Sequence, residues 1–92
     1  MIHVYVLRCV DGSLYVGMAR DLHVRVNAHN DGLGAAYTFK RRPVHLVYSE
    51  RFLSEAEAVK RERQLKNWSR TKKEALVRGD LQNLKRASRR RS

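Results

Sequence analysis

Residues 2–17 read IHVYVLRCVDGSLYVG, and this stretch decides the fold. Two runs rich in β-branched and aromatic residues, 2–9 and 14–16, flank the pair Asp11-Gly12. Such runs favour β-strands, and Asp-Gly between them is a strong signal for a tight turn. The stretch therefore predicts a β-hairpin at the start of the chain.

The length of the hairpin turn decides whether Tyr5 and Tyr15 can act together, because a shift of one residue moves a side chain to the opposite face of the sheet. A two-residue loop would separate the two phenols. A three-residue loop, residues 10–12, with Gly12 in the left-handed conformation puts both on one face and Gly17 opposite Tyr5. The glycine would leave room for a ligand beside the Tyr5 hydroxyl. The alternative is ordinary cross-strand packing of two tyrosines.

Helix signals follow the hairpin. Asp21, Ser54 and Ser69 stand where N-cap residues are expected, and Ser54 forms a capping box with Glu57 three residues later. Gly79 is a C-terminal stop signal. The expected helices cover residues 22–30, 55–67, 70–78 and 81–87.

A third strand is expected over residues 44–52, after a loop over residues 31–43. Val44, Leu46 and Tyr48 alternate with the residues between them, as in a half-buried strand. A sheet of three strands is marginal alone, so helices must pack on it to complete the core. Because 92 residues hold material for one core only, we expect a single α+β unit, a small three-stranded antiparallel sheet flanked by helices.

The chain is strongly basic, with 20 Lys and Arg against nine Asp and Glu and a net charge of +11. Residues 51–92 hold 14 of the basic groups and five of the acidic ones, and residues 85–91 alone hold five basic groups. A positive field of this size attracts polyanions through counterion release and long-range steering. The expected partner is therefore a nucleic acid, DNA or RNA.

Cys9 is the only cysteine, which excludes an internal disulfide and a zinc site built from thiolates. No apolar run approaches the roughly 18 residues needed to span a bilayer, and the first residues lack the pattern of a secretion signal. We expect a soluble cytoplasmic protein with no membrane partner.

Arg25 and His29 stand one turn apart on the first predicted helix, about 40° from each other around its axis. Arginine offers a planar fork of donors that suits phosphate oxygens, and histidine can move a proton near neutral pH. The same spacing occurs in ordinary exposed pairs, so it suggests a site only together with other residues.

Glu62 falls inside the apolar arc that Ala58, Val59 and Leu65 form on the helix over 55–67. A carboxylate on an inward face needs a partner, because burying it alone is costly. The partner is either an arginine in a buried salt bridge or a metal ion. The pattern alone slightly favours the salt bridge.

An ordered set of motifs runs through residues 2–78: Val4-Tyr5, Tyr15-Val16-Gly17 ten residues later, Asp21-Leu22, Arg25, His29, and Glu62 within the run 55–66. This set resembles the GIY-YIG nuclease family. Residues 11–15, 34–38 and 42–48 are similar to stretches of its small stand-alone bacterial members. We assign residues 1–80 to a GIY-YIG nuclease-like domain and residues 81–92 to a short helix with a basic C-terminal tail.

The resemblance implies a metal-dependent endonuclease that hydrolyses phosphodiester bonds in DNA, in repair or recombination. Glu62 would hold one Mg²⁺ or Mn²⁺ that binds the scissile phosphate and its leaving oxygen. Tyr5 would be the general base for the attacking water, its deprotonation favoured by cationic surroundings, and Tyr15 would orient water or phosphate. Arg25 would neutralise charge on the phosphate, and His29 would assist proton transfer. Target choice would come from nucleic-acid shape, the tail or a partner protein.

Three positions depart from the family pattern. His3 replaces the glycine of the first signature, Met18 a lysine found in some members, and Glu74 an asparagine found in several. The last two changes predict slow or altered chemistry. The alternatives to an active enzyme are a nucleic-acid-binding module on the same fold with little or no catalysis, and a basic protein that docks on ribosomes or another assembly.

Basic side chains outside the motifs are expected to position a strand through its phosphates, without reading its sequence. Tyr37 is a further candidate contact, with burial as the alternative, and Trp68 is expected in the core. The basic candidates are Lys40, Arg41, Arg42, Lys60, Arg63, Lys66, Lys72 and Lys73.

Overall fold

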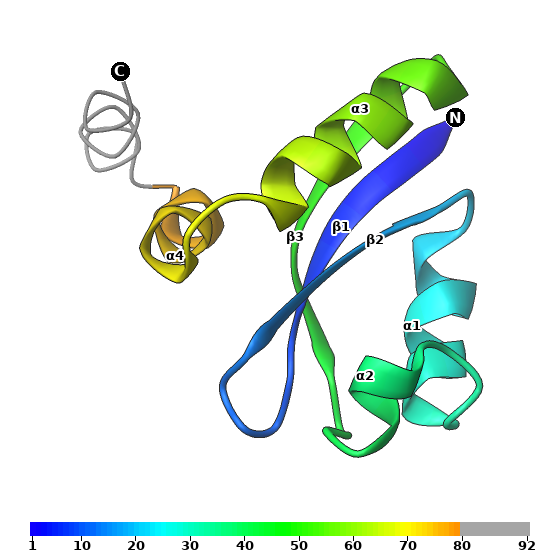
Figure 1. Cartoon of the computed structure of the whole chain (residues 1–92). Helices are drawn as coiled ribbons and strands as arrows, with labels where there is room; N and C mark the ends of the chain where they lie inside the picture. Colours follow the sequence, from blue (N-terminus) through cyan, green and yellow to red (C-terminus); the bar gives the residue numbers. More distant parts are fainter. Residues whose placement is uncertain (80–92) are drawn as a thin grey trace.

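An antiparallel sheet of three strands, in the order β2-β1-β3, forms the centre of the fold. The structure is a computed structural model that describes residues 1–79, so the helix predicted over 81–87 and the basic tail lie outside the described residues. The predicted α+β class is confirmed (Figure 1). In chain order the elements are β1 (Ile2–Arg8), β2 (Leu14–Ala19), α1 (Leu22–Asn30), α2 (Ala36–Phe39), β3 (His45–Phe52), α3 (Glu55–Lys66) and α4 (Arg70–Arg78).

The hairpin of β1 and β2 has the register of the three-residue loop, one of the two that the sequence left open. Tyr5 pairs with Gly17, and Leu7 pairs with Tyr15. Gly12 has a φ of 86°, the left-handed conformation that a three-residue loop requires. Both phenols therefore rise from the same face of the sheet.

Helices cover both faces of the sheet. Val4 and Val6 of β1 point to α3 and α4, where they meet Leu65 and Leu76 in one hydrophobic cluster. On the other face Leu7 joins a second cluster, against which α1 packs. Figure 1 shows α3 and α4 on one side of the sheet and α1 with α2 on the other. Each fully buried side chain of this size contributes about 1.5–3 kcal/mol.

The third strand differs from its predicted alternation. Its pairing with β1 shifts by one residue, since Val6 pairs with Tyr48 but Leu7 with Leu46. Val47 is the extra residue, and it packs on the cluster beneath α3. The predicted alternation of Val44, Leu46 and Tyr48 is therefore broken between Leu46 and Tyr48, and Leu46 is 41% exposed.

The predicted helix starts are confirmed. The side chains of Asp21, Ser54 and Ser69 each accept a backbone N–H of the helix that follows. The prediction of a plain loop over 31–43 is wrong in one respect, because this segment contains the short helix α2. Within residues 1–79, no helix combines the length and apolar character needed to cross a membrane.

Candidate active site

The five residues expected to act together line one cavity of about 230 Å³. It lies at β2, which is an edge strand of the sheet. At this edge α3 from one face and α1 from the other both reach the cavity, so residues from opposite faces meet there. The lining residues are Tyr5, Tyr15, Gly17, Met18, Arg25, His29, Gly34, Ala35 and Glu62.

A chain of hydrogen bonds runs from the cavity into α2. The Tyr5 hydroxyl lies 2.9 Å from His29 Nε2, and His29 Nδ1 lies 2.8 Å from Thr38 Oγ1. Thr38 in turn donates its hydroxyl proton to the Ala35 carbonyl at 3.0 Å. Tyr5 and His29 are each 2% exposed and Thr38 is fully buried, so these bonds have little competition from water.

The Thr38 hydroxyl sets the tautomer of His29. A hydroxyl has a single proton, and Thr38 donates it to Ala35. Thr38 Oγ1 must therefore accept from His29, which places the imidazole proton on Nδ1. In neutral His29, Nε2 is then an acceptor, and the Tyr5 hydroxyl donates to it.

Two glycines give these side chains their room. A Cβ at Gly17 would come within 2.5 Å of the Tyr5 hydroxyl, and a Cβ at Gly34 within 2.2 Å of His29 Nδ1. Neither glycine has a positive φ, so their role here is to leave space rather than to permit an unusual backbone. The sequence predicted room for a ligand beside the Tyr5 hydroxyl at Gly17; in the structure the Tyr5 ring itself lies where the Gly17 side chain would be, and Gly17 also lines the cavity.

Burial raises the pKa of the Tyr5 hydroxyl above its usual value, and the charges of Tyr15 and Glu62 raise it further. Arg25 alone acts in the opposite direction. The expectation that cationic surroundings favour deprotonation of Tyr5 is therefore not met by the residues of the site. At neutral pH Tyr5 is a phenol that donates its proton to His29.

Burial lowers the pKa of His29, and the charge of Arg25 lowers it further. His29 is consequently neutral at physiological pH and has one nitrogen ready to accept a proton. The expected alternative, an exposed pair of Arg25 and His29, holds only for Arg25, which is exposed.

Tyr15 lines the cavity, and Tyr37 packs against Tyr15 from outside the lining. Tyr15 packs edge-on against His29 with ring centroids 5.3 Å apart, and it stacks on Tyr37 with centroids 5.9 Å apart. Tyr37 is 39% exposed, so the alternative of a buried Tyr37 is wrong. Arg41 lies over the Tyr37 ring, 3.9 Å from its centroid.

Glu62 projects from α3 into the cavity, with its side chain 18% exposed. Its ion pair is with Lys66 one turn on, at 3.6 Å, and not with an arginine as the sequence slightly favoured. The arginine of α3 that does form a salt bridge is Arg61, which binds Glu50 of β3. Among residues 1–79, Glu62 is the one carboxylate that lines this cavity.

The donor set suits a metal ion that the protein holds weakly. Residues 1–79 contain no group of three or more His, Cys, Asp or Glu side chains that could hold an ion by themselves. Mg²⁺ commonly keeps several waters and binds one or two carboxylates together with substrate phosphates. A single Glu62 fits this mode of binding, and it does not fit a site closed by protein ligands alone.

The three departures from the family pattern occupy different places. Met18 lines the cavity, so the surface there is apolar where a lysine would add charge. Glu74 lies away from it and accepts two hydrogen bonds from Arg8, at 2.6 and 2.7 Å. His3 also lies outside the lining, and its Nδ1 is buried without a hydrogen-bond partner within residues 1–79.

The basic candidates fall into four groups. Arg41 and Arg42 are tied into their loop through bonds to carbonyls and over the rings of Tyr37 and Phe39. Lys72 is corrected: it is 7% exposed and its ammonium lies 4.1 Å from the centroid of the partly buried Trp68, so it packs rather than reaching a phosphate. Lys73 is half-buried beside a second cavity, and the exposed candidates are Lys40, Lys60, Arg63 and Lys66.

Thr38, Ala35 and Gly34 are site residues that the sequence did not single out. They belong to a stretch of small residues that was interpreted as loop. A threonine is common in loops, and nothing in its spacing indicates that it faces a histidine nine positions earlier. The only available signal was the likeness of residues 34–38 to family members.

Comparison with known proteins finds one matching family model and several similar proteins. The model of the GIY-YIG catalytic domain matches residues 1–75. A UPF0213 protein of Staphylococcus aureus is 53% identical over 74 residues, which are 80% of this chain and 90% of that protein. Two solution NMR structures are also similar. One, a UPF0213 protein from Bacillus halodurans, has 42% identity and a TM-score of 0.56 and covers 91% of this chain and 94% of that chain.

The other, a protein from E. faecalis, has 40% identity and a TM-score of 0.58 and covers 84% of this chain and 82% of that chain. A catalytic domain of this type points to nuclease chemistry on a nucleic acid. The match spans most of the chain and includes all five residues that meet in the cavity. The chain therefore belongs to the GIY-YIG catalytic domain family.

Proposed function

We propose that the protein is a metal-dependent endonuclease that hydrolyses phosphodiester bonds in DNA, in repair or recombination. The observation that carries the proposal is the cavity in which Tyr5, Tyr15, Arg25, His29 and Glu62 meet. It combines a proton relay, a cation and a carboxylate within one small space. These are the groups that hydrolysis of a phosphodiester requires.

The proton relay starts at the attacking water. As the water oxygen bonds to phosphorus and the bond to the leaving oxygen breaks, the Tyr5 oxygen takes a water proton, and the leaving oxygen departs as an alkoxide that takes a proton from solvent. Tyr5 passes its own proton to His29 Nε2, to which it is already hydrogen-bonded. His29 becomes an imidazolium, and its Nδ1–H remains held by Thr38. Tyr5 thus acts as a base without existing as a free phenolate.

The remaining residues handle charge and position. Arg25 offsets the negative charge that grows on the phosphate oxygens. Tyr15 orients the water or the phosphate, held in place by its contacts with His29 and Tyr37. Glu62 would hold one Mg²⁺ or Mn²⁺, which supplies Lewis-acid stabilisation of the phosphate and its leaving oxygen when bound.

The test measures cleavage of supercoiled plasmid, single strands and branched duplexes with Mg²⁺, with Mn²⁺ and with chelator. We expect nicking that depends on the metal ion. Glu62→Gln should reduce the rate of nicking by more than the roughly 10–100-fold that is lost when an outer-shell partner of a metal is removed. Glu55→Gln is the matched control, because this carboxylate lies in the first turn of the same helix and does not line the cavity.

The apolar Met18 in the cavity favours a second candidate, a nucleic-acid-binding module with little or no catalysis. The same assay separates the two. Binding without nicking under every metal condition, equal in the wild type, Glu62→Gln and Glu55→Gln, would exclude the enzyme and leave the module.

A further inference from the structure

A second cavity, of about 200 Å³, opens near the hairpin turn. Its lining residues are Ser13, Leu14, Tyr37, Arg70 and Lys73. Tyr37 belongs to this cavity and Tyr15 to the first one, and the two rings stack on each other with centroids 5.9 Å apart. One pair of stacked phenols therefore separates the two cavities.

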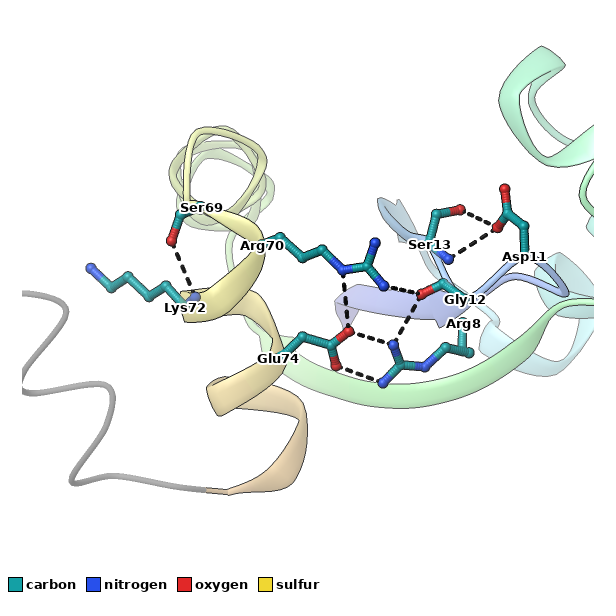
Figure 2. A network of polar contacts seen from close by, with 8 residues as sticks. All are labelled: Arg8, Asp11, Gly12, Ser13, Ser69, Arg70, Lys72 and Glu74. Carbon is teal, nitrogen blue, oxygen red and sulfur yellow. Dashed lines mark hydrogen bonds and ion pairs between the residues drawn. The ribbon is translucent and has the colours of Figure 1, made fainter.

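The Arg70 side of the second cavity is held in place by a polar network. Arg70 Nη2 donates to the Gly12 carbonyl at 3.0 Å, and Arg70 Nε lies 3.7 Å from Glu74. Glu74 is fixed by its two bonds to Arg8, which also donates to Gly12. Figure 2 shows these side chains bridging α4 and the turn between β1 and β2. The network positions Arg70 before any ligand arrives, which reduces the entropy lost on binding.

Two cations meet in the second cavity, and each can offer donors to an anion. A guanidinium has five N–H donors, and the contacts of Arg70 with Gly12 and Glu74 leave others. Lys73 is half-buried and forms no ion pair with any residue in 1–79. The nearby carboxylates of Asp11 and Glu74 already bind Arg41 and Arg8.

The character of the lining favours a phosphate over a base. The Tyr37 ring has Tyr15 stacked on it and the Arg41 guanidinium 3.9 Å from its centroid, so its faces are occupied. A nucleobase would need such a face for stacking. The Ser13 hydroxyl donates its single proton to Asp11 at 2.6 Å, so the hydroxyl that remains is that of Tyr37, beside two cations. A hydroxyl and two cations are donors from which phosphate oxygens accept.

We propose that the second cavity binds a backbone phosphate of the strand whose scissile phosphate lies in the first cavity. The inference rests on the proposed function and deepens it, because it gives the strand a direction across the surface, from the Glu62 cavity past the stacked Tyr15 and Tyr37 to Arg70 and Lys73. A second fixed phosphate keeps the scissile bond of the first one in register with Tyr5, as catalysis by positioning requires.

The experiment measures binding of fluorescent oligonucleotides to the full chain carrying Glu62→Gln, so that cleavage does not interfere. Each phosphate in turn is replaced by an uncharged methylphosphonate. We expect one replacement near the cleavage point to weaken binding about 10-fold in this protein. The same replacement should weaken binding less once Lys73→Gln is added, because only Arg70 then holds that phosphate. Lys73→Gln should also lower the slope of log affinity against log salt by about 0.9 on duplex or about 0.7 on single strands.

Arg51→Gln is the matched control, because it removes a positive charge that lines neither cavity. It should leave the effect of the critical methylphosphonate intact. If the effect of every methylphosphonate survives undiminished in Lys73→Gln, the second phosphate site does not exist, while the proposed nuclease function stands. If the Glu62→Gln protein binds no oligonucleotide at any salt concentration, the proposed function fails and the inference fails with it.

Discussion

Gly34 is the residue at which one added methyl group would disturb the site most directly. A Cβ there would lie 2.2 Å from His29 Nδ1, between the imidazole and its neighbours. We predict that Gly34→Ala displaces His29, breaks its bond to Tyr5 and lowers the rate of cleavage at least about 10-fold, since acid–base groups lose effect when misplaced. Single-turnover cleavage rates measure this.

Gly79→Ala is the control for Gly34→Ala. Gly79 has a left-handed φ of 71° but open space around its missing Cβ. The substitution should lower the free energy of unfolding by about 1–2 kcal/mol through backbone strain and leave the cleavage rate unchanged. Equal cleavage rates in Gly34→Ala and wild type would show that His29 does not need its present position.

Thr38 acts through His29 rather than on the substrate, so its substitution should change the tautomer of the histidine. Thr38→Val keeps the shape of the side chain and removes the hydroxyl that accepts from Nδ1. We predict that the imidazole proton then moves to Nε2, which can no longer accept from Tyr5. Cleavage should fall by up to the roughly 10²–10⁴-fold that a positioned acid–base group supplies.

The ¹⁵N chemical shifts of the His29 ring report which nitrogen carries the proton. Thr38→Ser restores the hydroxyl and should restore both the Nδ1–H tautomer and most of the cleavage rate. A slow Thr38→Val variant with an unchanged His29 tautomer would contradict this role, because loss of packing alone would then explain the defect.

At the scale of elements, the bond between Glu74 and Arg8 fastens α4 to the hairpin (Figure 2). We predict that Glu74→Gln lowers the free energy of unfolding at pH 7 by about 1 kcal/mol, the upper part of the range for partly exposed ion pairs, because the geometry is bidentate. The coupling energy between the two residues comes from chemical denaturation of four proteins: the wild type, Glu74→Gln, Arg8→Gln and the double variant.

The contribution of Glu74 should depend on pH with a definite sign. Its hydrogen bonds to Arg8 lower the pKa of the carboxyl below the usual 4.5. At a pH between the pKa of Glu74 in the folded protein and its pKa in the unfolded chain, the unfolded chain binds more protons. The free energy of unfolding therefore rises with pH in this range. The difference in the free energy of unfolding between wild type and Glu74→Gln should therefore be largest above pH 4.5. It should shrink as the pH falls through the pKa of Glu74 in the folded protein. A difference that stays constant down to pH 2 would contradict the ion pair.

The elements that the sequence predicted well are those that local signals determine. The hairpin followed from Asp11-Gly12, although two turn lengths and so two registers were open, and the helix starts followed from Asp21, Ser54 and Ser69. The extra residue in β3, Val47, and the helix α2 were missed. Both depend on tertiary packing, because Val47 fills a gap under α3 and α2 is a four-residue helix that packs its buried Thr38 on His29.

At the scale of the whole molecule, the site is a meeting of both faces of the sheet at its β2 edge. Periodicity could place Glu62 on the inward side of one helix and His29 on a stripe of another, but it could not bring the two helices to one cavity. Only the resemblance to a family predicted that convergence. The protonation state of Tyr5 was out of reach as well, since it depends on burial that no local pattern contains.

Position in the fold also decides which of the basic residues contribute to nucleic-acid binding. Lys60 of α3 is exposed, whereas Lys72 of α4 is 7% exposed with its ammonium 4.1 Å from the centroid of Trp68. We predict that Lys60→Gln lowers the slope of log affinity against log salt by about 0.9 on duplex DNA and leaves the free energy of unfolding unchanged. Lys72→Met should do the reverse, keeping the slope and losing about 0.5–2 kcal/mol of stability with the cation–π contact.

Anisotropy titrations at several salt concentrations and thermal melts of the same samples separate the two effects. The comparison is informative because both substitutions remove one unit from the same net charge of +11. If overall charge governed binding, the slope of log affinity against log salt would fall by the same amount in both variants. Burial of a lysine would then have no effect on its contribution to binding. A difference confined to Lys60→Gln would show that the nucleic acid contacts discrete phosphate-binding positions on the surface, of which α3 supplies one.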